Sequence, residues 1–180
     1  MASLLTHPAV PLAIATALGS GHVGNRLLLC GCLATVIADV DVIAFAFGIP
    51  YASPFGHRGF THSIAFALVL AVIAAVFAPR LHRSATTVFA FVLVAALSHP
   101  LLDAFTNGGL GVALAWPVSD ARWFAPWRPI EVSPIGLDPF FSEWGVRVVY
   151  SELLVVWLPL ATIAGCGWLW RRHRGRLTRP

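Results

Sequence analysis

Long apolar segments alternate with short polar stretches along most of the chain. A membrane-spanning helix needs about 20 predominantly apolar residues, and four segments approach or meet that length, at residues 27–49, 63–78, 86–105 and 151–170. A fifth apolar segment, residues 8–18, is too short to span comfortably, so whether it crosses the membrane stays open. The pattern predicts an all-α fold, a polytopic transmembrane bundle of four or five membrane helices.

A different composition marks the segment from about Thr106 to Tyr150. It is rich in tryptophan, proline and glycine, with Trp116, Trp123 and Trp127 among its aromatic residues. Such a segment favours an aromatic, loop-rich outer cap at the level of the lipid headgroups over a second folded domain. Because no internal repeat or low-complexity linker is found, residues 1–180 are predicted to form one membrane-embedded domain.

Composition supports the membrane assignment. Hydrophobic residues make up 58% of the 180 residues and charged residues only 11%, whereas a soluble domain carries about a quarter charged residues. This balance argues against an ordinary soluble enzyme and against a disordered chain. The first six residues lack the basic start of a signal peptide, so we expect them to remain in the mature protein.

Eight of the twelve arginines predict the orientation of the bundle, whereas Arg58, Arg122, Arg128 and Arg147 fall on the other side, where long loops translocate largely regardless of charge. If the segments alternate, Arg26, the loop with Arg80 and Arg83, and the basic tail at residues 171–180 fall on one side, which the positive-inside rule assigns to the cytoplasm. We therefore expect a multi-pass protein of the bacterial inner membrane with a cytoplasmic C-terminus. The tail suits a flank facing anionic membrane lipid, and no nucleic-acid partner is expected.

Ionisable residues interrupt two of the apolar segments. Asp39 and Asp41 lie in one, and His99 and Asp103 lie in another. Each such group costs about 2.5–3.5 kcal/mol at the centre of a membrane helix and is a functional-site candidate by default. Counted at about 1.5 Å per residue from the cytoplasmic helix ends, these groups fall in the outer half of the bundle.

The spacing of these residues suits metal binding. His99 and Asp103 are four apart, so a helix places them on one face, able to share an ion. Asp39 and Asp41 are two apart and point about 200° away from each other in a regular helix, so one would bind metal while the other supports a ligand or binds a second ion.

The segment His57-Arg58-Gly59-Phe60-Thr61-His62-Ser63 adds two imidazoles at a helix N-terminus, where Thr61 and Ser63 are candidate caps. Arg58 is suited to bind a phosphate. His7 joins these groups if the first segment begins outside. Mixed histidine and aspartate ligands favour zinc, manganese or iron over calcium, and such an ion with an open position activates a water for hydrolysis.

Other interpretations stay open for single residues. Any of the intramembrane groups could be a device for hydrogen bonding between helices, and His7 could be a solvated terminal residue. Thr106 is close enough to Asp103 in sequence to orient it. The acids Glu131, Asp138, Glu143 and Glu152 are expected at the surface.

Several of these residues, in this order, carry a family resemblance: His7, the Asp39-x-Asp41 pair, the heptad at 57–63, Ser98-His99-Pro100-Leu101-Leu102-Asp103 and Trp116-Pro117. The chain resembles the bacterial inner-membrane metal-dependent hydrolases of the YdjM type. The likeness covers residues 7–127, and the heptad is its most specific part. It implies a membrane-embedded helical bundle whose histidines and aspartates hold a divalent metal ion, with no assigned substrate, and a more distant similarity to zinc-dependent phospholipase C proteins points to a phosphoester.

Together these arguments predict a membrane-bound metal-dependent hydrolase that acts on a phosphoester or lipid-like substrate at the outer leaflet. Its partners are membrane lipid and a small-molecule or lipid substrate, and its cofactor is a divalent ion, zinc ahead of manganese or iron. The predicted metal ligands are His7, Asp41, His57, His62, His99 and Asp103. The predicted catalytic residues are Asp39, Arg58 and Thr61, and the predicted substrate-binding residues are Arg58, Trp116, Trp123 and Trp127.

Two other functions remain possible. A proton or metal-ion transporter would use the same groups as a relay, although the nearly apolar inner segments at 27–33 and 86–95 offer it no polar path. A non-catalytic membrane protein would use them as a structural network, with the aromatic cap binding a protein partner.

Overall fold

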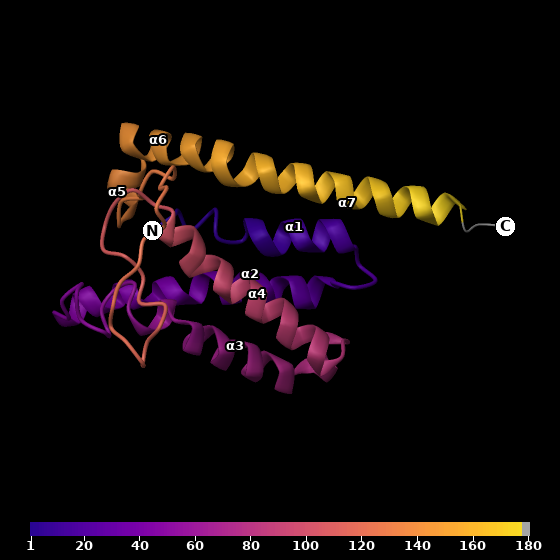
Figure 1. Ribbon diagram of the computed structural model, residues 1–180, viewed down its shortest axis with the longest axis horizontal. Coiled ribbons are helices and arrows are strands. Elements are labelled where there is room, and N and C mark those ends of the chain that lie inside the picture. Colours follow the sequence, from indigo (N-terminus) through magenta and orange to yellow (C-terminus); the bar gives the residue numbers. More distant parts are fainter. Residues whose placement is uncertain (178–180) are drawn as a thin grey trace.

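The computed structural model describes residues 1–177 and consists of helical segments that run back and forth along one long axis (Figure 1). No β-strand occurs in these residues, which contain only two isolated bridges, Thr106 with Ile130 and Val112 with Trp123. The elements in chain order are α1 (Ala9–Leu18), α2 (Asn25–Val36), η1 (Ile37–Phe47), η2 (Phe60–His62), α3 (Ile64–Val76), η3 (Ala78–Leu81), α4 (Ala85–Ala104), α5 (Leu137–Phe140), α6 (Glu143–Glu152), η4 (Leu153–Trp157) and α7 (Leu158–Leu177). The all-α prediction is confirmed.

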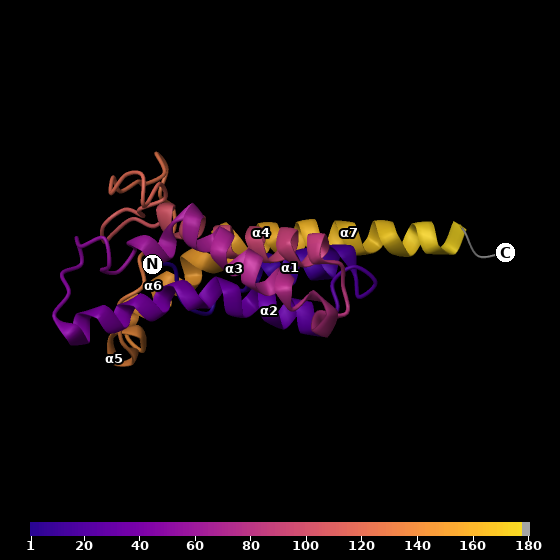
Figure 2. The same ribbon diagram turned by 90° about the horizontal axis from the view of Figure 1, so that it is seen from below.

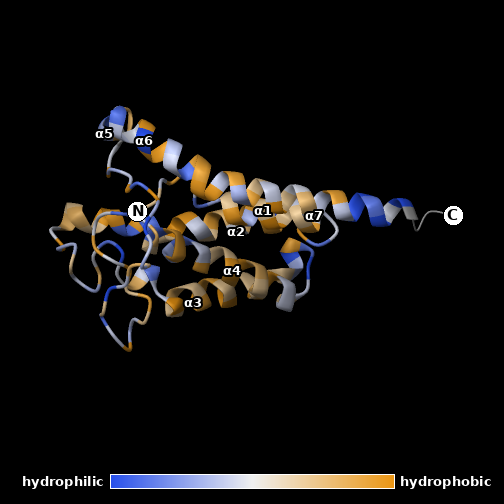
Figure 3. Cartoon of the chain, turned by 45° about the horizontal axis from the view of Figure 1, so that its top comes forward, coloured by the Kyte–Doolittle hydropathy of each residue, from blue (hydrophilic) through white to orange (hydrophobic). Residues whose placement is uncertain are grey.

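Three continuous helical stretches are long and apolar enough to cross a membrane: Asn25–Phe47, Ala85–Ala104 and Glu143–Arg176. The shorter apolar helices α1 and α3 lie beside them, which gives the polytopic bundle that the hydrophobic pattern predicts. Large apolar side chains cover the outside of these helices, as expected where the surroundings are lipid. Figure 3 shows this apolar covering, with hydrophilic residues gathered at the far end of α7.

The predicted segment at 27–49 is not one regular helix. An α-helix ends at Val36, and a 3-10 helix continues from Ile37 to Phe47. A 3-10 helix of eleven residues is unusually long and is often associated with functional or strained sites. With about three residues per turn, Asp39 and Asp41 point about 120° apart, so the two side chains face adjacent directions rather than nearly opposite ones.

The last membrane helix begins earlier than predicted. Ser142 caps it by accepting a hydrogen bond from the backbone N–H of Trp144, and the chain stays helical through a π-helical turn, η4, to the end of α7. The outer cap therefore ends near Ser142 and not at Tyr150. The basic tail continues the helix to Leu177, and the predicted flank residue Arg179 lies outside the described residues.

Close packing holds the bundle together. Helix α4 packs against both α2 and α3, and α1 packs against α7. Small residues permit this approach, since a Cβ atom on Gly31 of α2 would lie 2.4 Å from the ring of Phe91 on α4. In Figure 1 the α6–α7 rod lies along one edge, over α1, with the other helices on the far side of α1.

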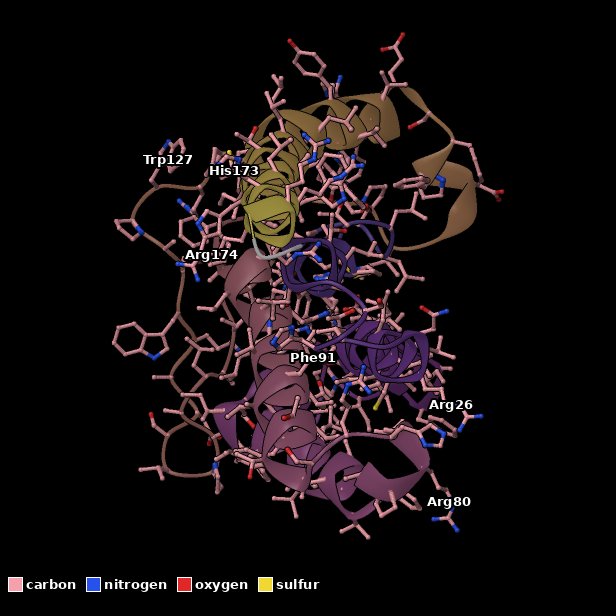
Figure 4. All side chains as sticks on the ribbon, turned by 90° about the vertical axis from the view of Figure 1, so that its right-hand side faces the viewer. Arg26, Arg80, Phe91, Trp127, His173 and Arg174 are labelled. Atoms are coloured by element: carbon pink, nitrogen blue, oxygen red, sulfur yellow. The ribbon has the colours of Figure 1, made fainter. Side chains whose placement is uncertain are left out.

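The two ends of the bundle differ in chemistry. Figure 4 looks onto one end, where Arg26 and Arg80 lie on one side of the molecule and Arg174 on the other. Arg171 there donates to the backbone oxygens of Thr16 and Ala17 at the end of α1. The opposite end holds the N-terminal segment, η1 and the cap loops, which project to one side in Figure 2. The arginines that were predicted to share one end, Arg26, Arg80, Arg83 and those of the tail up to Arg176, lie away from the cap, whereas Arg58 and Arg122 lie at the cap end.

Candidate metal centre

Five side chains from four parts of the chain meet at the end opposite the basic tail, and we call this group the central site. His7 precedes α1, Asp39 lies on η1, His62 ends η2, and His99 and Asp103 lie one turn apart on α4. All are buried, and only Asp39 has measurable exposure, at 7%. The central site is thus enclosed by protein.

The distances inside the central site are short. The Nε2 atoms of His62 and His99 lie 2.9 Å apart. Asp39 Oδ1 lies 3.5 Å from the Nε2 atom of His99 and 3.7 Å from that of His62, and Asp103 Oδ2 lies 3.4 Å from His62 Nε2. His7 Nε2 lies 3.7 Å from one oxygen of each aspartate.

This arrangement fits a divalent metal ion. Zinc binds nitrogen and oxygen at about 2.0–2.2 Å, which places tetrahedral ligand atoms about 3.3–3.6 Å from one another, inside the observed range of separations. Both ring nitrogens of His7 and both oxygens of Asp39 lack a hydrogen-bond partner although they are buried. Unpaired buried polar atoms are costly, and a bound cation would satisfy them.

Two histidines are oriented by neighbouring acceptors. His99 Nδ1 lies 2.5 Å from the backbone oxygen of Thr35, and His62 Nδ1 lies 3.2 Å from Asp41 Oδ2. When Nδ1 donates to these oxygens, the lone pair resides on Nε2, the atom that faces the central site. Histidines that bind metals are commonly held in this way.

The pKa values of His7 and His62 are shifted in opposite directions. Burial and the nearby His99 lower the pKa of His7 to about 3, so His7 is neutral and its lone pair is free to bind. Burial also lowers the pKa of His62, but the carboxylates of Asp103 and Asp41 outweigh it and raise that pKa to about 9. The surrounding carboxylates therefore favour positive charge at this position, which either a proton on His62 or a bound cation would supply.

Asp41 differs from Asp39 because its carboxylate is fully hydrogen-bonded. Its carboxylate accepts hydrogen bonds from Thr61 Oγ1 at 2.5 Å, from His57 at 2.6 Å and from the backbone N–H of Arg58 at 3.1 Å. His57 Nε2 is buried without a partner. Asp41, His57 and His62 also form a second group whose ligand atoms lie close enough together to share an ion.

The loop at the start of the heptad is tight, and only glycine fits at position 59. Arg58 has a left-handed backbone with φ of 61°, and a Cβ atom on Gly59 would lie 2.1 Å from the backbone oxygen of Pro54. Ser63 caps α3 as predicted, by accepting from Phe66 N–H. Thr61 is not a cap, because its hydroxyl donates to Asp41.

Arg58 is buried and committed to the protein. Its Nε atom lies 3.1 Å from Asp103, and its Nη atoms donate to the backbone oxygens of Gly108 and Leu110 and to Thr106 Oγ1. Thr106 donates to the backbone oxygen of Asp103, so it does lie beside this aspartate. The guanidinium fastens the cap loop to the central site and presents no exposed donor to a substrate anion.

The three predicted substrate-binding tryptophans lie in the cap. Trp116 packs against the rings of Phe55 and Phe60, whereas Trp123 and Trp127 are 57% and 68% exposed. Figure 4 shows Trp127 at the outer edge of the molecule. Within residues 1–177, no hydrogen bond or ring contact joins these tryptophans to the central site.

One important acid was predicted wrongly. Glu152, expected at the surface, is 2% exposed and accepts hydrogen bonds from the backbone and hydroxyl of Ser3 and from the hydroxyl of Thr6. The signal was present, because Glu152 stands at the start of the apolar segment 151–170. The alternative interpretation of His7 as a solvated residue is also wrong, since its side chain is fully buried.

Comparisons with known proteins agree with the fold and the motifs. The family described as YdjM inner membrane protein matches residues 1–174, beyond the segment 7–127 on which the resemblance rested. The chain is 44% identical over 174 residues to the inner membrane protein YbcI of Escherichia coli strain K12, a match that covers 96% of this chain and all of the relative. No solved structure matches. The chain therefore belongs to the YdjM inner membrane protein family.

Proposed function

We propose that this inner-membrane protein is a metal-dependent hydrolase whose central site holds a divalent ion. The observation that carries the proposal is the convergence of Asp39, His62, His99 and Asp103, whose buried ligand atoms lie close enough together to share an ion. The unpaired Nε2 atom of His7 lies beside them, 3.7 Å from one oxygen of each aspartate. Zinc fits this donor set best, and manganese or iron would also suit it.

We assign Asp39 to the metal and Asp41 to the support of His62 and His57, which exchanges the roles predicted from the sequence. The reason is hydrogen bonding: the oxygens of Asp39 are unpaired, whereas those of Asp41 are engaged. Thr61 fixes Asp41 in place. His57, paired with Asp41 and carrying a free Nε2 atom, is the candidate for proton transfer.

Arg58 takes a positioning role in place of substrate binding, because its donors hold Asp103 and the cap loop. Trp123 and Trp127 are placed to contact lipid headgroups. When bound in such a site, a divalent ion lowers the pKa of a water and polarises a phosphoryl or carbonyl oxygen. A phosphoester or lipid-like substrate is the class that suits this chemistry in a membrane.

The orientation follows from the two ends of the bundle. We infer that the arginine-rich end faces the cytoplasm and that the central site faces the outer side, since positive residues are retained on the cytoplasmic side.

A structural metal site is the second candidate, and the burial of the central site favours it. Closed sites without an open position are typical of structural metals. In that case removing the ion would unfold the bundle, whereas a catalytic centre would leave it folded.

The test is a substrate screen with purified protein in lipid nanodiscs, loaded with zinc, manganese or iron. We expect metal-dependent hydrolysis of a phosphoester or lipid ester that is lost in His57→Gln and in Asp39→Asn. Metal-loaded protein that hydrolyses none of these substrates, and whose thermal midpoint collapses on chelation, would favour the structural site.

A further inference from the structure

The segment before α1 covers the central site. Ala2, Ser3, Thr6 and His7 are between 0% and 2% exposed. The backbone N–H of Ala2 donates to Asp103 Oδ1 at 2.6 Å, and the ring of His7 stacks on His99 with centroids 3.7 Å apart. This segment therefore supplies one central-site residue and lies against two others.

The segment is fastened by the last membrane helix rather than by its neighbours in sequence. Glu152 accepts hydrogen bonds from Ser3 Oγ at 2.6 Å, from Thr6 Oγ1 at 2.8 Å and from the backbone N–H of Ser3. Trp157 Nε1 also donates to Thr6 Oγ1, at 2.9 Å. Figure 1 shows the N-terminus and α6 at the same end of the bundle.

The position of Glu152 supports a specific role. A buried carboxylate is tolerated only when its oxygens are hydrogen-bonded, and here the backbone N–H of Ser3 and the hydroxyls of Ser3 and Thr6 supply those hydrogen bonds. Glu152 directly precedes the π-helical turn η4, a feature often found at functional sites. Packing of apolar residues alone would not require an acid at this place.

We propose that Glu152 is a positioning residue for the metal centre. By fastening Ser3 and Thr6, it holds His7 at the distance that completes the ligand set and keeps the segment closed over the ion. The last helix, which contributes no side chain to the central site, is thereby coupled to metal binding. The proposal rests on the metal centre proposed above.

The test is a double-mutant cycle read by zinc affinity, with full-length protein in detergent and a competing chelator. Glu152→Gln removes one strong acceptor and is expected to weaken zinc binding about tenfold, the usual cost of disturbing the support of a ligand. In a His7→Ala background the same change is expected to alter affinity less than about twofold, because its effect passes through His7. Glu143→Gln, an exposed acid on the same helix, is the matched control and should leave zinc affinity unchanged.

If Glu152→Gln folds poorly, a second variant removes the hydroxyl donors of Ser3 and Thr6 instead of the acid. Ser3→Ala with Thr6→Val leaves the acid in place and should weaken zinc binding in the wild-type background but not beside His7→Ala. If the wild type binds zinc and neither set of variants changes the affinity, the role of Glu152 is overturned and the metal centre is not. Equal weakening with and without His7 would also overturn it, as an effect on general stability. Wild-type protein that binds no zinc would overturn the metal centre and this inference together.

Discussion

At the scale of single residues, hydrogen bonding separates the groups that face the central site from those that support them. The sequence predicted that intramembrane histidines and aspartates gather at one end, and for the described residues they do. It assigned Asp41 to the metal and Asp39 to catalysis without the information that decides between them, because the directions of the two side chains depend on the 3-10 geometry of η1. Nor could it show that Arg58 is buried, since a guanidinium beside two histidines fits a substrate anion equally well.

The exchange of roles between the two aspartates is tested by charge-neutral variants. Asp39→Asn is expected to abolish zinc binding, because it removes a ligand. Asp41→Asn is expected to weaken it about 10–100-fold, the range for partners that orient a ligand. Zinc titration against a chelator measures both, and tighter binding in Asp39→Asn than in Asp41→Asn would reverse the assignment.

Arg58→Lys tests the positioning role of the guanidinium. Lysine keeps the charge but cannot reproduce the bonds to Gly108, Leu110 and Thr106. The loss of two or more hydrogen bonds at about 1 kcal/mol each is expected to lower the free energy of unfolding by about 2 kcal/mol. Thermal denaturation in detergent measures the change. If Arg58→Lys melts at the same temperature as the wild type, Arg58 does not hold the cap loop.

At the scale of elements, hydrophobic periodicity predicted where helices occur, but it did not predict where the helix type changes or where the last membrane helix begins. The segments at 63–78 and 86–105 correspond to α3 and α4 within a few residues. The change from α2 to η1 was missed because the apolar pattern continues through Val36 without interruption. The early start of α6 was missed because Ser142 sits among cap residues, where a serine is unremarkable.

Helix packing gives a prediction with an internal control. Gly31→Ala places a methyl group against Phe91 between α2 and α4, whereas Gly21→Ala meets no atom within 4 Å. We expect the first change to lower the free energy of unfolding by about 1–3 kcal/mol through overpacking, and the second to leave it nearly unchanged. Thermal denaturation of the two variants side by side measures this. Equal melting temperatures would indicate that α2 and α4 are not in close contact.

At the scale of the whole molecule, one end is basic and the other holds the central site and the cap. Arginine positions alone predicted this polarity. They could not predict that the first residues close over the site, because the decisive contacts join Ser3 and Thr6 to Glu152, almost the length of the chain away. Contacts so distant in sequence leave no local pattern.

The orientation is tested by labelling single cysteines in cells after Cys30, Cys32 and Cys166 are replaced. Val118, 91% exposed on the cap, changed to cysteine should react with a membrane-impermeant maleimide applied from outside. A cysteine at Arg172 on the basic end should react only after the membrane is permeabilised. The opposite pattern would invert the topology and place the central site toward the cytoplasm.

The central claim is that the buried histidines and aspartates hold a metal ion, and elemental analysis of the purified protein tests it most directly. The wild type, prepared without chelators, should carry about one zinc, manganese or iron ion per chain, as should the control His22→Ala/Asp120→Ala, which alters an exposed histidine and an exposed aspartate. The folded His99→Ala/Asp103→Ala variant should carry none. Metal-free wild type, even after reconstitution with these ions, or an equal metal content in all three proteins, would contradict the account.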